Sequence, residues 1–157
     1  MSSELIINSS RDKSRIGLLK DKKLVEFHQE TDETKFNVGD IYVGKVKKIN
    51  KSLNAAFIDI GFEKDAFLHY LDLGPQFLSL KSFVKKTRSK GKSTPYDSFS
   101  KLEDINKFGK ITEVLKKGDE LLIQIVKEPI STKGPRVTTE LSLAGRYLIL
   151  VSFSEAI

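Results

Sequence analysis

Two phenylalanines, Phe57 and Phe67, are the residues whose type and spacing point most directly to chemistry. They lie in two short strand-like runs, 53–60 and 64–69, whose alternate positions are apolar at Ala56, Ile58, Ile60, Ala66 and Leu68. Because successive residues of a strand point to opposite faces, both phenylalanine rings are expected on the solvent side, among charged neighbours. Large rings on that side favour a binding role, and nucleic-acid bases stack on such rings.

A catalytic or metal site has little support in the sequence. The chain has no cysteine, and its two histidines, His28 and His69, stand in no motif that places a base beside a nucleophile. Asp59 and Asp65 have the right chemistry for a metal pair, but aspartates near turns are commonplace. We therefore expect no catalytic residue, no metal ligand and no cofactor within this chain.

The positive charge is confined to one part of the sequence. The formal net charge is +6, and the 37 residues from Lys81 to Lys117 hold 11 Lys or Arg against 4 Asp or Glu. The remainder of the chain is close to neutral. Localised positive charge attracts phosphate in a salt-dependent way, although a solvated basic loop without a partner remains the alternative.

The elements that position these residues are predicted to be short strands. Runs at 15–20 and 24–28, separated by Asp21-Lys22-Lys23, predict a small antiparallel hairpin after a first apolar run at Leu5. In the run 41–49 we expect the inward positions to be Ile41, Val43, Val46 and Ile49, with an irregularity near Gly44.

Two further strands are predicted after a long basic segment. Residues 77–108 show little apolar periodicity and are expected to form a mobile loop, followed by a short helix at 111–117 that ends at Gly118. Strands are then expected at 120–127 and 137–143. Five short strands with a long insertion between the third and fourth predict a mainly β protein with an OB-type barrel and a flanking hairpin.

The sequence resembles the ribonuclease E/G family of bacterial endoribonucleases, and its barrel resembles an S1 RNA-binding domain. The residues that carry the resemblance are Ile41-Tyr-Val-Gly-Lys-Val, Ser52-Leu-Asn-Ala-Ala-Phe-Ile-Asp-Ile-Gly, Ala66-Phe-Leu, Lys133-Gly, Thr138-Thr and Leu141-Ser-Leu-Ala-Gly-Arg-Tyr-Leu-Ile-Leu. The resemblance covers nearly all of the chain outside the basic insertion, which is longer than the family's link at this position.

The resemblance implies a set of RNA-binding residues. Phe57 and Phe67 match the family's stacking phenylalanines, and Lys133 matches a lysine placed to meet phosphate before the last strand. His69 falls where many S1 domains carry a base-contacting histidine, although a histidine there is as often an ordinary surface residue. Arg136 and Lys45 are weaker candidates, because barrel faces often carry charge without a ligand.

The resemblance also implies an organisation into three parts. Residues 1–36 would be part of a split ribonuclease-H-like subdomain, 37–143 an S1 domain with the basic insertion at about 74–117, and 144–157 the start of a subdomain that senses the RNA 5′ end. We expect the chain to be cut from a longer protein, whose Mg²⁺-dependent catalytic residues and homo-oligomer contacts lie elsewhere. Its partners would be single-stranded RNA and those remaining subdomains.

Two functions remain open on the sequence. The first is single-stranded RNA binding as part of an endoribonuclease, and the second is a non-catalytic barrel that serves as a structural or protein-binding module, for example on the ribosome. The sequence contains no run of about 18 apolar residues, so it predicts no membrane-spanning helix. The first residues lack the pattern of a secretory signal, which with the absence of cysteine favours the cytoplasm.

Overall fold

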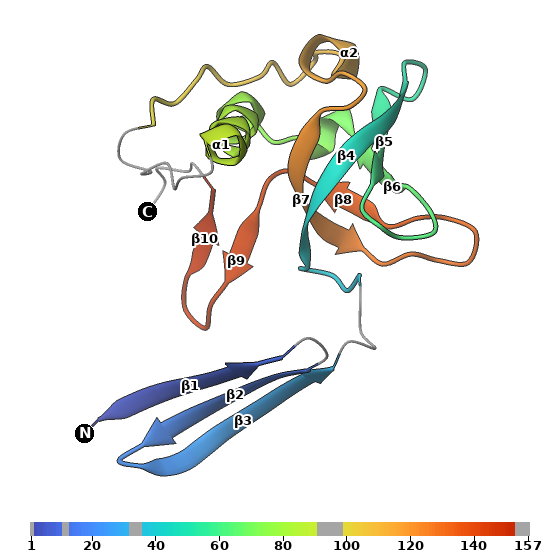
Figure 1. Cartoon of the computed structure of the whole chain (residues 1–157). Coiled ribbons are helices and arrows are strands. Elements are labelled where there is room, and N and C mark those ends of the chain that lie inside the picture. The colour runs from blue at the N-terminus through green and yellow to red at the C-terminus, as the bar shows by residue number, and fades with distance from the viewer. Residues whose placement is uncertain (1, 11–12, 32–35, 91–98, 153–157) are drawn as a thin grey trace. The chain divides into compact units, whose positions relative to one another are not determined.

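The computed structural model describes residues 2–10, 13–31, 36–90 and 99–152 (Figure 1). Two compact units make up the chain, Met1–Lys35 and Phe36–Ile157. The first unit is a three-stranded antiparallel sheet of β1 (Ser3–Ser9), β2 (Lys13–Lys20) and β3 (Lys23–Thr31), in that order. The predicted hairpin is β2–β3, and the first apolar run adds a third strand to it.

The second unit is built on a closed five-stranded barrel, which confirms the predicted OB-type architecture. Its strands follow the order β4-β5-β6-β8-β7, with the single parallel pair between β6 and β8. Their bounds are β4 Ile41–Asn50, β5 Ala55–Asp59, β6 Ala66–His69, β7 Glu120–Lys127 and β8 Arg136–Thr138. Ala56, Ile58, Ile60, Ala66 and Leu68 all point into the buried core, as their alternation predicts.

In strand β4 the predicted inward set is wrong at two positions. Ile41 and Val43 are 39% and 47% exposed, whereas Gly44 and Val46 are buried. The ladder irregularity lies between Val46 and Lys48, not near Gly44, so the outward and inward positions change over at that later point. Gly44 is needed inside the barrel, because a Cβ there would overlap the Ile58 side chain.

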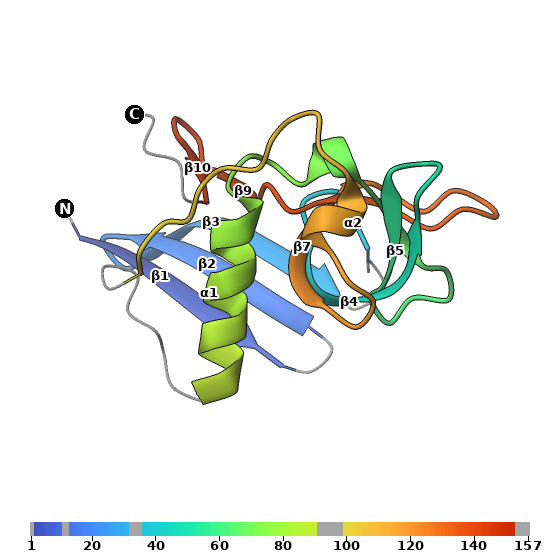
Figure 2. The ribbon, with the colours of Figure 1, turned by 90° about the horizontal axis from the view of Figure 1, so that it is seen from above.

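The first part of the segment predicted to be a mobile loop is helical, whereas its described residues 99–108 form neither helix nor strand. A 3₁₀ turn, η1 (Tyr70–Asp72), leads to helix α1 (Phe77–Lys90), which runs beside β7 (Figure 2). Phe77, Leu80 and Val84 follow one helix face and are buried. Residues 91–98 lie outside the described residues. The short helix α2 is confined to Ile111–Val114, and the turn at Gly118 follows with positive φ.

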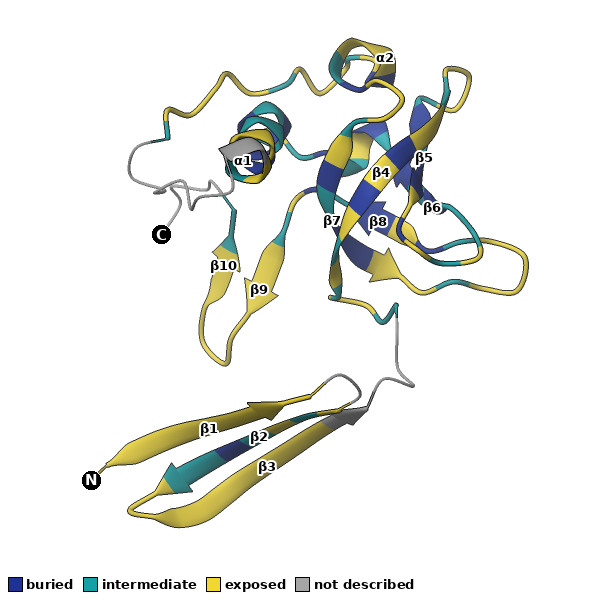
Figure 3. Cartoon of the chain, viewed as in Figure 1, coloured by how far each residue is buried: buried dark blue, intermediate teal, exposed yellow. Residues whose placement is uncertain are grey.

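The last strand of the barrel ends earlier than predicted. Strand β8 stops at Thr138, because the backbone N–H of Thr139 donates to the carbonyl of Asp72 in η1. Ser142 and Leu143, which were predicted to belong to this strand, instead begin β9 (Ser142–Ala144), which pairs with β10 (Ile149–Val151). The β9–β10 hairpin is largely exposed (Figure 3). Of the third part expected at 144–157, residues 153–157 lie outside the described residues.

Candidate nucleic-acid interface

Phe57 and Phe67 lie directly opposite each other on neighbouring strands β5 and β6. Their ring centroids are 5.8 Å apart, with an angle of 70° between the ring planes. Both side chains are half-buried, while their strand neighbours Ile58, Ala66 and Leu68 fill the core. The two rings therefore lie on the outer wall of the barrel, on the side that alternation predicts.

His69 extends this aromatic surface along β6. Its ring centroid is 6.5 Å from that of Phe67, and the ring planes are 32° apart. The backbone N–H of Leu71 donates to His69 Nδ1 over 3.1 Å, so His69 also caps the η1 turn. Because Nδ1 accepts this hydrogen bond, the neutral imidazole carries its proton on Nε2, which can donate to a base or a phosphate.

Strand β4 places lysines beside the aromatic pair. Lys48 lies opposite Phe57, and Lys45 lies opposite Asp59 further along the same pair of strands. Sequence patterns singled out Lys45 but not Lys48, because the bulge between Val46 and Lys48 changes which residues face outward. The signal that could have identified Lys48 is the run of three lysines within four positions, at 45, 47 and 48.

Lys47, at the bulge, is held by a carboxylate. Its Nζ lies 2.9 Å from Asp65 Oδ1, and this hydrogen bond, with the charge of Asp65, raises the pKa of Lys47. Its side chain is exposed, so the ion pair contributes little to stability. Lys47 is therefore held by Asp65. The positions of Lys45 and Lys48 in the strand register require no such pairing.

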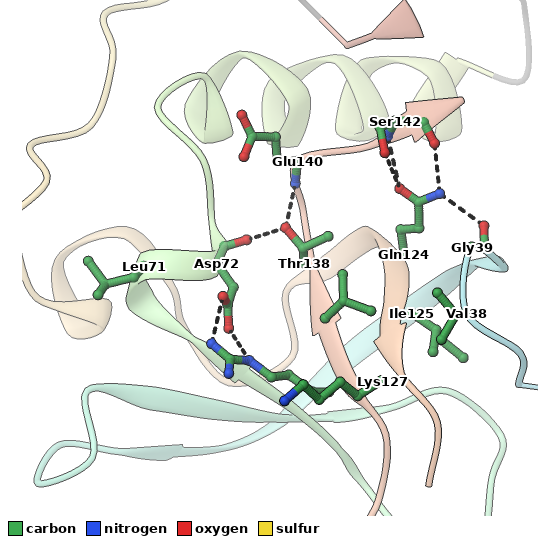
Figure 4. Close-up of a pocket in the computed structure, with 12 residues that line it drawn as sticks. Val38, Gly39, Leu71, Asp72, Gln124, Ile125, Lys127, Thr138, Glu140 and Ser142 are labelled. Atoms are coloured by element: carbon green, nitrogen blue, oxygen red, sulfur yellow. Dashed lines mark hydrogen bonds and ion pairs between the residues drawn. The ribbon is translucent and has the colours of Figure 1, made fainter. Parts of the chain in front are cut away.

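Arg136, on β8, lies opposite Phe67 and is bound to Asp72. Its Nε and Nη2 donate to the two carboxylate oxygens of Asp72, each over 2.9 Å (Figure 4). The hydrogen bond and charge of Asp72 raise the pKa of Arg136. This bidentate pair fixes η1 to β8, so Arg136 has a structural task beside any contact with a ligand. Lys127 lies opposite Arg136 on β7 and continues the row of cations, a neighbour that no sequence pattern had predicted.

The close-up in Figure 4 shows the hollow beside this ion pair. Thr138 donates its hydroxyl to the Asp72 carbonyl over 2.7 Å, and Gln124 Nε2 donates to the carbonyls of Gly39 and Ser142. Gln124 Oε1 accepts from the backbone N–H of Ser142. Both side chains are thus occupied in joining β7 and β8 to the segments around them.

The loop between β7 and β8 holds Lys133 next to the start of β6. Gly134 packs so closely on the carbonyl of Asp65 that a Cβ there would overlap it. Lys64 Nζ donates to the carbonyl of Ser131, and the backbone N–H of Phe67 donates to the carbonyl of Pro135. Lys133 itself is exposed. The loop that carries it is therefore anchored to the strand that carries Phe67.

Together these residues form what we call the aromatic face of the barrel. It consists of Phe57, Phe67, His69, Lys45, Lys48 and Arg136, with Lys133 in the adjoining loop. Such a face can stack on planar rings and attract phosphate. In the described part of the chain, no group of three or more His, Cys, Asp or Glu side chains is placed to hold a metal ion.

No protein-family model matches the chain, but several curated proteins do. Ribonuclease G of Escherichia coli (strain K12) is 32% identical over 151 residues, which is 96% of this chain and 27% of that protein. Ribonuclease G of Haemophilus influenzae is 34% identical over 148 residues, or 94% of this chain and 26% of that protein. A ribonuclease E/G-like protein of Porphyra purpurea is 37% identical over 123 residues, 78% of this chain and 19% of that protein. The chain thus spans about a quarter or less of the length of these relatives. None of the described helices is long and apolar enough to cross a membrane.

Proposed function

Because this chain belongs to the ribonuclease E/G family and corresponds to one segment of its members, we propose that its barrel binds single-stranded RNA on the aromatic face. The observation that carries the proposal is the pair of half-buried phenylalanines on the outer wall, flanked by cations from strands β4 and β8 and from a loop. If these rings served only to fill the hydrophobic core, they would point into the barrel.

Single-stranded RNA fits this face better than a duplex. In a duplex the bases are stacked on one another and their ring faces are hidden, whereas unpaired bases can be laid against aromatic side chains. Stacking contributes roughly 1–3 kcal/mol per base and does not depend on which base is present. Binding to the aromatic face is therefore expected to tolerate sequence changes.

The cations contribute attraction to phosphate that salt weakens. Lys45, Lys48 and Lys133 are exposed, so each can exchange a counterion for a phosphate group. In this proposal the barrel positions the RNA strand, and His69 Nε2 donates a hydrogen bond to a base or phosphate. Hydrolysis of RNA with Mg²⁺, which the resemblance implies for the full-length protein, is assigned to none of the described residues.

The proposal is tested by titrating a fluorescent oligouridylate of about twelve nucleotides, a length within the range that one OB fold covers. The wild type is compared with the Phe57→Ala/Phe67→Ala variant and with Phe108→Ala, which removes a ring that is 91% exposed in the same unit. The double variant is expected to lose about 1–3 kcal/mol of binding free energy or more, and the Phe108 variant none. Equal affinity of the wild type and the double variant would contradict the proposal. No binding by the wild type at physiological salt would favour the protein-binding alternative.

A further inference from the structure

A cleft with an excess of cations lies between helix α1 and the turn that leads into β7. Its volume is about 680 Å³, and its charged lining comprises Lys81, Lys85, Arg88, Lys116, Asp119 and Glu120. The cations in this lining exceed the carboxylates by two. Lys85 and Lys116 are exposed and account for this excess, because Lys81 is paired with Asp119 and Arg88 with Glu120. We refer to it as the α1 cleft.

The walls of the α1 cleft are fixed by ion pairs and hydrogen bonds. Lys81 Nζ donates to Asp119 Oδ2 over 2.6 Å and to the carbonyl of Val114 over 2.9 Å. Asp119 Oδ2 also accepts from the backbone N–H of Lys116 over 2.8 Å, and Arg88 Nε lies 3.0 Å from Glu120 Oε2. These contacts hold α1 against the turn and β7, so the cleft is formed before any ligand arrives.

Apolar packing supports the same arrangement. Leu80 and Val84 of α1 are buried against Leu122 of β7 and Leu141. The helix is therefore a packed part of the second unit, and its outer cations are held in place relative to the barrel. A basic segment that was free in solution would not present a fixed row of charges.

Strand β4 connects the α1 cleft to the aromatic face. The backbone N–H of Val46 donates to the carbonyl of Asp119, and the carbonyl of Val46 accepts from the N–H of Gly118, each over 2.8 Å. On either side of Val46, Lys45 lies opposite Glu120 and Lys48 lies opposite Phe57. One short stretch of β4 thus borders both surfaces, and its lysines lie between them.

We propose that the α1 cleft binds the phosphate backbone of the same RNA strand whose bases stack on the aromatic face. This inference rests on the proposed function and extends it. The RNA strand crosses β4 over Lys45 and Lys48. Its next phosphates then enter the α1 cleft near Lys85 and Lys116. Ammonium groups attract phosphate as point charges without reading sequence, so the cleft adds length and salt dependence to the site and no base preference.

The experiment uses two oligouridylates, of about four and about twelve nucleotides, which bracket much of the site-size range of an OB fold. The Lys85→Gln/Lys116→Gln variant removes two cleft charges while leaving both ion pairs that hold α1. The control, Lys20→Gln/Lys23→Gln, removes two exposed charges that lie opposite each other in the first unit. Dissociation constants are measured over a series of salt concentrations, and urea unfolding checks that each variant folds as the wild type does.

The cleft variant is expected to bind the long oligonucleotide more weakly than the wild type does. The slope of the logarithm of its association constant against the logarithm of salt concentration should be smaller in magnitude by about 1.4, which is about 0.7 for each lost phosphate contact. Binding of the short one is expected to stay unchanged, and the control variant should match the wild type with both. An unchanged salt slope with the long oligonucleotide would overturn the inference, as would an equal loss with both lengths. Failure of the proposed function is distinguishable, because Phe57→Ala/Phe67→Ala would then bind both lengths as the wild type does.

Discussion

Phe57 and Phe67 meet edge to face, opposite each other across β5 and β6, with 5.8 Å between ring centroids and 70° between ring planes. Because the planes are steep to one another, the two rings do not present a single flat platform. A base that lies flat on one ring meets the edge of the other. The two side chains thus form one binding surface, and each supports the orientation of its neighbour.

Single substitutions of these rings are therefore expected to be non-additive. Phe57→Ala and Phe67→Ala should each cost about 1–3 kcal/mol in binding to an oligouridylate, while the double variant should cost less than the two added together. The coupling is measured as a double-mutant cycle from four dissociation constants. Strict additivity would show that the rings act on separate bases and would contradict the idea of a single surface.

The position of Lys133 is expected to depend on Gly134. A Cβ at Gly134 would overlap the backbone carbonyl of Asp65, which cannot move aside without disturbing β6, so Gly134→Ala should push the loop away from that strand. RNA binding is expected to weaken in this variant at least as much as in Lys133→Gln. The salt slope of Lys133→Gln should fall by about 0.7 if Lys133 meets one phosphate. Wild-type binding by Gly134→Ala would show that the anchoring of this loop is irrelevant to the site.

The barrel is expected to reject a side chain at Gly44. The added methyl group of Gly44→Ala would overlap Ile58 in the core, and overpacking of this kind costs about 1–3 kcal/mol in the free energy of unfolding. Urea denaturation provides the measurement. In an Ile58→Ala background the same substitution should cost less, because the space is then open. An equal cost in both backgrounds would place the strain elsewhere.

The stability of the second unit is expected to fall at high pH through Tyr70. Burial, and then the charge of Glu113, raise the pKa of this tyrosine above its usual value of about 10. The folded state thus binds the proton more tightly than the unfolded chain, so this contribution is complete below pH 10 and is lost as the pH rises through the folded-state pKa. Tyr70 also donates its hydroxyl to the carbonyl of Asn106 over 2.6 Å.

Tyr70→Phe should accordingly lose about 1 kcal/mol at neutral pH, where the hydrogen bond is intact in the wild type, and less above pH 10. Tyr147→Phe is the control, because that ring is 83% exposed. The free energy of unfolding is measured by denaturant titration from pH 7 to pH 11. A difference between Tyr70→Phe and wild type that stays constant over this range would show that Tyr70 does not titrate with folding.

Local pattern carried the predictions about the barrel. Alternation in β5 and β6 is a property of neighbouring residues, so it identified Ile58 and Leu68 as core and Phe57 as outward-facing without any knowledge of the fold. The approximate positions of the five strands along the chain followed from turn signals between short apolar runs. The same reasoning failed at Ile41 and Val43 of β4, because it placed the irregularity near Gly44 and not between Val46 and Lys48, so the residues before the bulge were assigned to the wrong face.

Long-range contacts decided what the sequence could not. The basic segment is a helix at α1 because Leu80 and Val84 find apolar partners on β7, and β8 ends early because Thr139 binds the η1 turn. Neither partner is near in sequence. The charge of Arg136 was visible from the start, but its bidentate pairing with Asp72, 64 residues away, was not.

The sequence alone thus determined the barrel, the outward position of its two aromatic rings and the segment that carries the positive charge, since each depends on residue type and on a spacing of a few residues. Only the tertiary structure decided which cations lie beside those rings and which are held by carboxylates. Those pairings join distant parts of the chain, and they form only when the core brings β4, β7, β8 and α1 together.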